Sequence, residues 1–258
     1  MDYGEFSLME NYKKLAGDKT PFNEFEIKNV LQSLKNVSPP SSSGGSFNEQ
    51  EMISFLKERA HLNHKEWDVT DESSTILRSA LLSEGTVETN AAFKMAFRRV
   101  LEEGNWFGAA SFASDQSICK PDGYKPWIVL VTGVNGIRKT TTIYEPWFEK
   151  VLRQALEFSA VTPGSGSPST DAETILPVGS NSFFRQLDHM IAVLSNEDFA
   201  RLYELDDLKK YAELKDGIFT RYRKVAESLG VLLLKEAQSR KMNAMVETSG
   251  RVSENMYF

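Results

Sequence analysis

The sequence contains little cysteine and few histidines. Its 258 residues include one cysteine, Cys119, and three histidines. A single cysteine excludes an internal disulfide and fits a reducing compartment, so we interpret Cys119 as a structural residue. Two of the histidines, His61 and His64, form an H-x-x-H pattern with no third ligand nearby in the sequence. Since a metal site needs further ligands, we interpret this pair as metal-free.

Long apolar runs are also missing. Runs such as residues 127–131 and 231–234 are short, whereas a membrane-spanning helix needs about 20 apolar residues. Residues 1–14 contain acidic side chains and lack the basic start and apolar core of a secretory signal. The sequence therefore predicts a cytoplasmic protein with no membrane partner.

Basic residues are not in excess. The chain has 30 Lys and Arg against 36 Asp and Glu, which gives a net charge of -6 and a pI of about 5.3. Such a balance predicts no nucleic-acid partner, because binding to phosphate backbones needs a basic surface. Apolar residues make up 41% of the chain, so a sizeable core is available.

Composition and periodicity divide the chain into three predicted regions. Residues 1–46 hold a helical segment followed by a Ser/Pro/Gly linker. Residues 47–124 form a second helical region, in which Asn48 caps a helix and Gly104 ends one. Residues 125–258 form the third region. No catalytic motif is visible in the helical half, which is a candidate surface for a protein partner.

The third region alternates strand and helix patterns. Residues 127–133 predict a buried strand and residues 160–174 a loop. Residues 141–159 predict a helix that Pro146 either kinks or delays in its regular part. A short strand at 175–179, helices over 181–195 and 196–241, and a strand at 242–250 follow. This alternation predicts an α/β domain with a parallel sheet and flanking helices.

The stretch "GVNGIRKTTT" carries the clearest chemistry. It follows a strand, precedes a helix and resembles the phosphate loop G-x-x-x-x-G-K-[ST] of nucleotide-binding proteins. We expect backbone N–H groups to surround a phosphate, Lys139 to contact the β- and γ-phosphates, and Thr140 to bind Mg²⁺. The predicted nucleotide-binding residues are Gly133, Val134, Asn135, Gly136, Ile137, Arg138, Lys139, Thr140 and Thr141.

Arg138 departs from this pattern, which has glycine before the lysine. If the position requires a positive φ, a side chain costs roughly 1–2 kcal/mol and impairs the loop. If Arg138 is already the first helical residue, it is tolerated and its charge assists phosphate binding. The sequence leaves both alternatives open.

Residues 125–251 resemble the zeta toxin kinases, a family of P-loop small-molecule kinases. Besides the loop, "NSFFRQLDHM" is similar to the family's D-x-F-R segment, and "MVETSGR" to its strand ending in "IEGTGR". The resemblance implies transfer of the γ-phosphoryl group of ATP to a hydroxyl of an unknown small-molecule acceptor, with Mg²⁺. Arg185 matches the family arginine and would contact phosphate or substrate, or else is a solvated helix charge.

The general base and the metal ligand follow from this resemblance and from the strand pattern. Family members use the aspartate of D-x-F-R as base, and Asn181, or Ser182 after a shift of one residue, stands there. Asp188 is the candidate substitute if the segment is arranged differently. Glu247 is predicted at the carboxyl end of a strand, where it would hold Mg²⁺ or orient the substrate.

Two other interpretations remain. "GVNGIRKTTT", "NSFFRQL" and "ETSGR" also resemble motifs of signal-recognition-particle GTPases, which would make the nucleotide GTP. A third possibility is a non-catalytic nucleotide-binding or interaction module. Either P-loop family needs more strands after "ETSGR", so the sequence predicts a domain truncated at its C-terminus. Arg221 and Arg223 would then replace lid arginines, or else form an exposed helical face.

Overall fold

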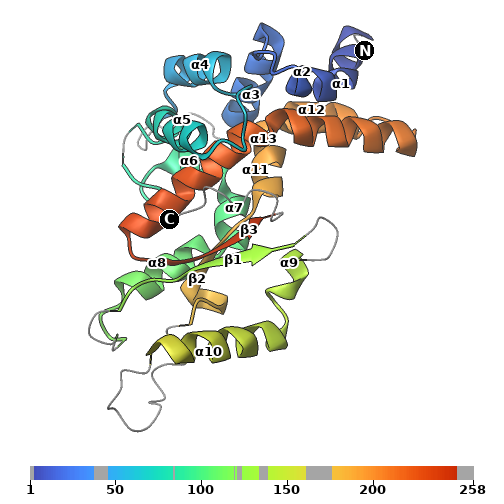
Figure 1. The fold of residues 1–258 in the computed structure, drawn as a ribbon. Helices are drawn as coiled ribbons and strands as arrows, with labels where there is room; N and C mark the ends of the chain where they lie inside the picture. Colours follow the sequence, from blue (N-terminus) through green and yellow to red (C-terminus); the bar gives the residue numbers. More distant parts are fainter. Residues whose placement is uncertain are drawn as a thin grey trace. The chain divides into compact units, whose positions relative to one another are not determined.

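The computed structural model describes residues 3–37, 46–83, 85–118, 120, 124–133, 139–160 and 176–248. The chain divides into two compact units, each built from two stretches of sequence (Figure 1). Unit 1 contains Met1–Val100 and Gln186–Leu233, and unit 2 contains Leu101–Arg185 and Leu234–Phe258. Within the described residues, no helix is long and apolar enough to cross a membrane. The domain boundaries expected from composition stay predictions.

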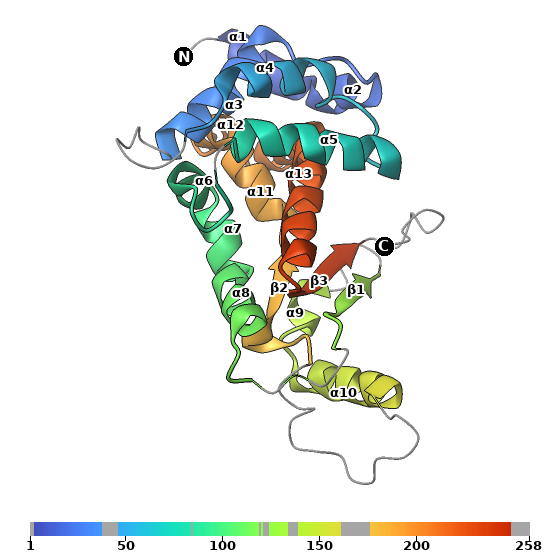
Figure 2. The same ribbon diagram turned by 90° about the vertical axis from the view of Figure 1, so that its left-hand side faces the viewer.

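The regular elements described in unit 1 are helices (Figure 2). They are α1 (Tyr3–Glu10), α2 (Tyr12–Gly17), α3 (Glu24–Val37), α4 (Glu49–Glu58), α5 (Trp67–Leu81), α6 (Ala91–Ala96), α11 (Leu187–Leu194), α12 (Asn196–Leu202) and most of α13 (Leu208–Ser239). Helix α7 (Arg98–Glu103) continues from unit 1 into unit 2. The helical character predicted for the first half and for residues 196–241 is therefore confirmed.

Asparagine side chains define where several of these helices begin. The Asn48 carboxamide oxygen accepts a hydrogen bond from the Glu51 backbone N–H, as the sequence predicted. At the start of α3, Asn23 Oδ1 accepts from the Glu26 N–H, and Glu26 Oε2 accepts from the Asn23 N–H, both at 2.9 Å. These reciprocal bonds satisfy N–H groups that the first helical turn leaves without a partner.

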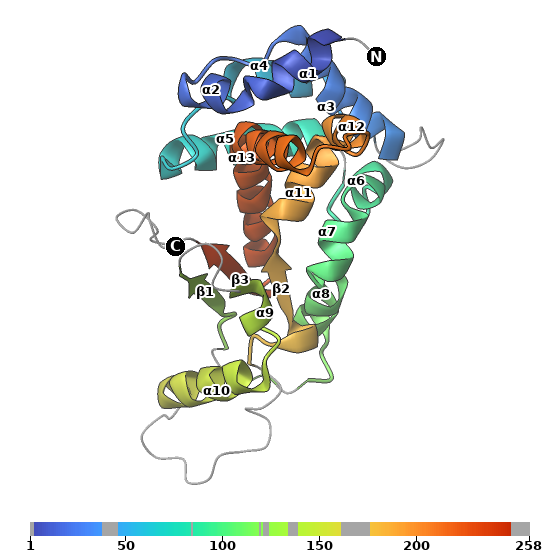
Figure 3. The same cartoon turned by 90° about the vertical axis from the view of Figure 1, so that its right-hand side faces the viewer.

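Unit 2 contains a parallel sheet in the order β1-β3-β2 (Figure 3). Its strands are β1 (Ile128–Thr132), β2 (Ser182–Arg185) and β3 (Asn243–Thr248). Its helices are α8 (Trp106–Ser114), α9 (Lys139–Thr142), α10 (Pro146–Ala160) and the short 3-10 helix η2 (Gly179–Asn181). The protein is thus mainly helical, with a small three-stranded parallel sheet packed by helices.

Apolar side chains cover both faces of the sheet. On one face, Val131, Phe184 and Met245 pack with Ile143, which follows α9, and with Phe148 of α10. On the other face, Ala244, Val246 and Ile128 pack against Leu234 near the end of α13. The central strand β3 is buried over residues 243–246, whereas the edge strand β1 is only partly buried and its Leu130 is 39% exposed. The strand predicted over residues 127–133 is therefore present, but the burial predicted for it is wrong, because among the described strands β1 has a neighbour on one side only.

Two predicted elements near β2 are wrong. The sequence placed residues 182–185 in a helix, but they form a buried strand that pairs with β3. Residues 176–178 are bends followed by η2 instead of the strand predicted at 175–179. A short apolar run fits a strand as well as a buried helix, and here pairing with β3 decides the outcome.

Pro146 separates α9 from α10 as the sequence predicted. It is the first residue of α10, where a missing N–H costs nothing because that group has no intrahelical partner. The loop predicted at 160–174 falls almost entirely on residues 161–175, and these, with the linker at 38–45 and Cys119, lie outside the described residues.

Candidate functional site

The carboxyl ends of the three parallel strands form the candidate site. Thr132 of β1 lies in register with Thr248 of β3, and Arg185 of β2 lies in register with Val246. Parallel strands end at the same edge of a sheet, and ligands of open α/β sheets bind there. The sequence predicted this convergence for β1 and β3, and the register confirms it.

Gly133 directly follows β1 and has a φ of +155°. Side-chain residues rarely adopt such a conformation, so glycine is required where the chain leaves the strand. Residues 134–138, including Arg138, lie outside the described residues. The predicted contacts of this loop with phosphate therefore stay predictions.

Lys139 begins α9 and reaches back to β3. Its Nζ lies 3.7 Å from Oε1 of Glu247, an ion-pair distance that is too long for a hydrogen bond. The Lys139 side chain is 5% exposed and that of Glu247 is 30% exposed. A lysine at the first position after the loop thus points to the carboxyl edge of the sheet. Thr140 is the next residue of α9, and Thr141 is exposed.

Arg185 is the third charged residue at this edge. It ends β2 and is 5% exposed, so it is not the solvated helix charge that was one of its two interpretations. Its Nη2 donates to the backbone oxygen of Glu247 at 3.5 Å. Lys139, Arg185 and Glu247 therefore converge from α9, β2 and β3, and together carry two positive charges and one negative charge.

Asn181 lies at the opposite end of the sheet. Its Oδ1 accepts hydrogen bonds from the Val178 N–H at 3.0 Å and, at 3.2 Å, from Nδ2 of Asn243, the first residue of β3. Four residues of extended chain separate it from Arg185, roughly 13 Å at the usual strand rise. The position that the resemblance aligns with the family's catalytic aspartate therefore lies away from the candidate site.

Asp188 is not grouped with these residues. It is an exposed residue in the first turn of α11 and belongs to unit 1. Its assignment as a catalytic residue stays a prediction.

His61 and His64 do not share a helix face. They lie between the end of α4 and the start of α5, and burial lowers the pKa of both imidazoles. Among the described residues, no group of three or more His, Cys, Asp or Glu side chains is placed to hold a metal ion.

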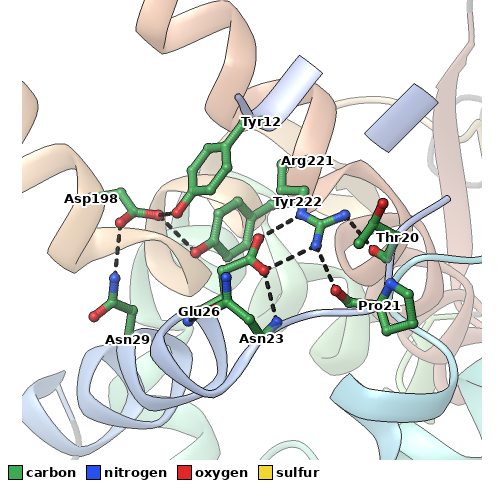
Figure 4. A network of polar contacts seen from close by, with 9 residues as sticks. All are labelled: Tyr12, Thr20, Pro21, Asn23, Glu26, Asn29, Asp198, Arg221 and Tyr222. Carbon is green, nitrogen blue, oxygen red and sulfur yellow. Dashed lines mark hydrogen bonds and ion pairs between the residues drawn. The ribbon is translucent and has the colours of Figure 1, made fainter. Parts of the chain in front are cut away.

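Unit 1 contains a buried polar cluster that was not predicted from the sequence (Figure 4). Asp198 is fully buried, and its Oδ2 accepts hydrogen bonds from the hydroxyls of Tyr12, at 3.0 Å, and Tyr222, at 2.7 Å. Its Oδ1 accepts from Asn29 Nδ2 at 3.0 Å and from Arg201 at 3.4 Å. Burial raises the pKa of Asp198 above its ordinary value, while these hydrogen bonds act in the opposite direction.

Arg221 belongs to the same region and is not part of the candidate site. Its Nε and Nη2 donate to the Glu26 carboxylate at 2.6 and 3.0 Å. Its Nη1 donates to the Thr20 carbonyl, and Nη2 also donates to the Pro21 carbonyl. Arg221 is 2% exposed, so the exposed face predicted for it is wrong. The buried cluster connects α2 and α3 to α12 and α13, which indicates a structural role.

Comparison with models of protein families, with curated protein sequences and with solved structures found no match to this chain.

Proposed function

We propose that the protein binds a nucleoside triphosphate, with ATP the favoured nucleotide, through a phosphate loop at residues 133–141. The observation that carries the proposal is the convergence of Lys139 and Glu247 at the carboxyl edge of a parallel sheet. The lysine follows the strand-loop segment, and the carboxylate is the second-last residue of the adjacent strand. This is the arrangement that a phosphate-loop site requires, because phosphates need a cation from the loop side and a metal ligand from a neighbouring strand.

The residues present fit Mg²⁺ as the accompanying ion. Mg²⁺ prefers oxygen ligands and retains several waters, so a partly exposed carboxylate such as Glu247 suits a water-mediated contact. Thr140 would supply the direct hydroxyl ligand. Bound Mg²⁺ would neutralise charge on the phosphates, and Lys139 would contribute the fixed positive charge at the same place.

The resemblance to zeta toxin kinases extends the proposal to phosphoryl transfer onto the hydroxyl of a small molecule. In this proposal the sheet is of the P-loop type, Lys139 stabilises the transferred phosphoryl group, and Arg185 contacts phosphate or acceptor. Arg185 supports the extension because it is buried and lies beside Glu247.

A specific observation favours nucleotide binding without transfer as the second candidate. Transfer needs a base close to the acceptor hydroxyl. At the carboxyl edge of the sheet, Glu247 is the carboxylate among the described strand residues, and Asn181 lies at the other end. A GTPase of the signal-recognition-particle type remains a further alternative, which competition between ATP and GTP would distinguish.

Calorimetric titration with ATP and Mg²⁺ tests the proposal. We expect the unaltered chain to bind and Lys139→Ala to bind at least about tenfold more weakly, because one fixed cation of the phosphate site is lost. Lys150→Ala is the matched control, since Lys150 is an exposed lysine on α10. Equal affinity of the unaltered chain and Lys139→Ala, or no binding by the unaltered chain, would contradict the proposal.

Arg138→Gly tests whether the loop is impaired. A gain in affinity would mean that the arginine strains the loop, whereas unchanged affinity would mean that its position tolerates a side chain. Incubation with labelled ATP and candidate sugars then separates phosphoryl transfer from binding alone.

A further inference from the structure

Helices α3 and α4 lie side by side in unit 1 and form a groove at the surface (Figure 2). At one end, the Lys35 ammonium in the last turn of α3 lies 2.7 Å from the carboxylate of Glu49, the first residue of α4. The groove has a volume of about 400 Å³, which lies in the range of clefts that bind ligands.

Helix α3 presents different residues to the groove and to the interior of unit 1. The interior face carries Glu26, Asn29 and Ser33, which form hydrogen bonds with residues of α12 and α13. The face that borders the groove is made by residues within 24–35 at spacings of three and four. The hydrogen bonds within unit 1 therefore account for the first face and leave the second to border the groove.

The floor of the groove is apolar. Ile27 is 5% exposed, and Leu31 and Ile53 are half-buried. A partner that removes the rest of this surface from water gains free energy by doing so. Because the apolar residues of α3 recur at helical spacing, an amphipathic helix that offers apolar residues at the same spacing matches the floor.

The groove favours a helix over an extended peptide as its occupant. Backbone groups in the middle of α3 and α4 bond within each helix, so the walls offer side chains alone. An extended peptide would leave its own backbone groups without partners above the apolar floor, whereas a helix satisfies them internally. The face of α3 over residues 24–35 has room for about three turns of such a helix.

The rim of the groove is basic. Lys28 of α3 and Lys57 of α4 are exposed, and neither forms an ion pair within the part of the chain that the structure describes. The lining carries three lysines against two glutamates, Glu24 and Glu49, and Glu49 is already paired with Lys35. This local excess of positive charge stands on a chain whose net charge is -6, so it favours an acidic occupant.

We propose that this groove docks an acidic amphipathic helix of a protein partner. The apolar residues of that helix cover Ile27, Leu31 and Ile53, and its flanking carboxylates lie beside Lys28 and Lys57. The charges at the rim orient the helix and exclude basic competitors, while the apolar floor supplies most of the affinity. The proposal does not rest on nucleotide binding and gives the helical unit a function of its own.

Selection from a displayed library of amphipathic helices by the full chain tests the proposal. The library varies the apolar positions among Leu, Ile, Met and Phe, and the flanking positions among Glu, Gln and Lys. We expect the unaltered chain to enrich helices with Glu at the flanking positions. The chain that carries Lys28→Glu and Lys57→Glu should instead enrich helices with Lys.

Fluorescence anisotropy with the enriched helix as a labelled peptide measures the size of the effect. We expect the double reversal Lys28→Glu with Lys57→Glu to weaken binding about tenfold, because two attractions become two repulsions. Lys28→Gln with Lys57→Gln removes the charges without reversing them and should lose less. Lys125→Glu with Lys150→Glu is the matched control, since both lysines are exposed in unit 2 and the change in net charge is the same.

Each contrary outcome overturns the proposal. No enriched helix, or enriched helices without a preference for acidic flanks, would show that the groove does not dock such a partner. Equal affinity of the unaltered and doubly reversed chains would place the peptide elsewhere. A dimer of the unaltered chain in sedimentation equilibrium that dissociates on double reversal would show that a second copy occupies the groove instead of a different protein.

Discussion

At the scale of single residues, Lys224 combines deep burial with a positive charge. It is 3% exposed, and its Nζ donates to Thr70 Oγ1 at 2.9 Å. Burial lowers its pKa from 10.5 to about 8, although Glu227 and Glu66 act in the opposite direction. The difference corresponds to about 3 kcal/mol of unfavourable free energy when the folded protein holds the proton.

We expect Lys224→Met to stabilise the protein at pH 7 by about 1–3 kcal/mol, since it removes a buried charge and loses one hydrogen bond. The folded lysine loses its proton near pH 8, whereas the unfolded lysine keeps it until about pH 10.5. The stability of the unaltered chain should therefore rise with pH across this window, and the advantage of the variant should shrink.

Urea unfolding at pH 7 and pH 9.5 measures both effects. Lys209→Met, which replaces an exposed lysine on the same helix, is the control and should show neither. An advantage of Lys224→Met that stays constant with pH would mean that the lysine is not titrating in this range.

The buried carboxylate of Asp198 is expected to stabilise the folded protein. Asp198→Ala leaves the hydroxyls of Tyr12 and Tyr222 without their buried acceptor, so we expect a loss of about 3 kcal/mol in the free energy of unfolding. Asp198→Asn keeps one acceptor oxygen and should lose less. Equal losses in chemical denaturation would show that the acceptor oxygen does not matter.

Site residues differed in how far the sequence could predict them. Lys139 and Glu247 could be placed because Lys139 comes after β1 and its loop, Glu247 lies near the carboxyl end of β3, and parallel strands end at the same edge of a sheet. Arg185 could be matched to a motif but not placed, since its segment was predicted as helix. The burial of Arg221 could not be predicted from the sequence, because its partner Glu26 is 195 positions away and an arginine in a charged helix normally faces solvent.

At the scale of elements, the segment comprising α2 and α3 is held by buried charge as well as by apolar packing. The ion pair between Glu26 and Arg221 has side-chain exposures of 0% and 1%. Phe22 and Tyr12 pack on Tyr222 beside it, with ring centroids 5.6 and 6.1 Å away. Breaking a buried pair leaves one uncompensated charge, whereas replacing both partners removes the charges together.

We therefore expect Arg221→Met alone to cost about 3–5 kcal/mol and the double variant Glu26→Met with Arg221→Met to cost clearly less. Thermal and urea unfolding of the two single variants and the double variant gives the coupling energy. Additive losses would show that the two side chains stabilise the fold independently.

The elements themselves were predictable where they are long and periodic. The helices α3, α4 and α13 carry apolar residues at helical spacing, and Asn48 marked a start that the structure confirms. Strand β2 was not predictable, because four residues hold too little periodicity. Its conformation depends on Asn243–Thr248, a strand about 60 residues later in the chain.

At the scale of the whole molecule, the two units are interleaved along the chain. Residues 186–233 belong to unit 1 and lie between the two stretches of unit 2. A fragment of residues 125–258, cut at the predicted boundary, would contain α11, α12 and α13 without their partners from the first hundred residues. The buried side chains of Ile218, Val225 and Leu229 on α13 would then be exposed to water.

We expect that fragment to aggregate or to lack cooperative unfolding, because burial of these side chains contributes about 1.5–3 kcal/mol each in the whole chain. Size-exclusion chromatography and thermal unfolding by circular dichroism test this against the intact protein. A monomeric fragment with a sharp transition would show that residues 125–258 fold without the preceding helices.

The strand order β1-β3-β2 also affects how the protein folds while it is being synthesised. The central strand is the last of the three to leave the ribosome, and β1 and β2 each pair with it. More than a hundred residues separate the end of β1 from the start of β3, so the first strand cannot pair until these residues have been synthesised. During that interval its apolar side chains are available to chaperones, and the carboxyl edge that holds Glu247 is completed only after β3 has been synthesised.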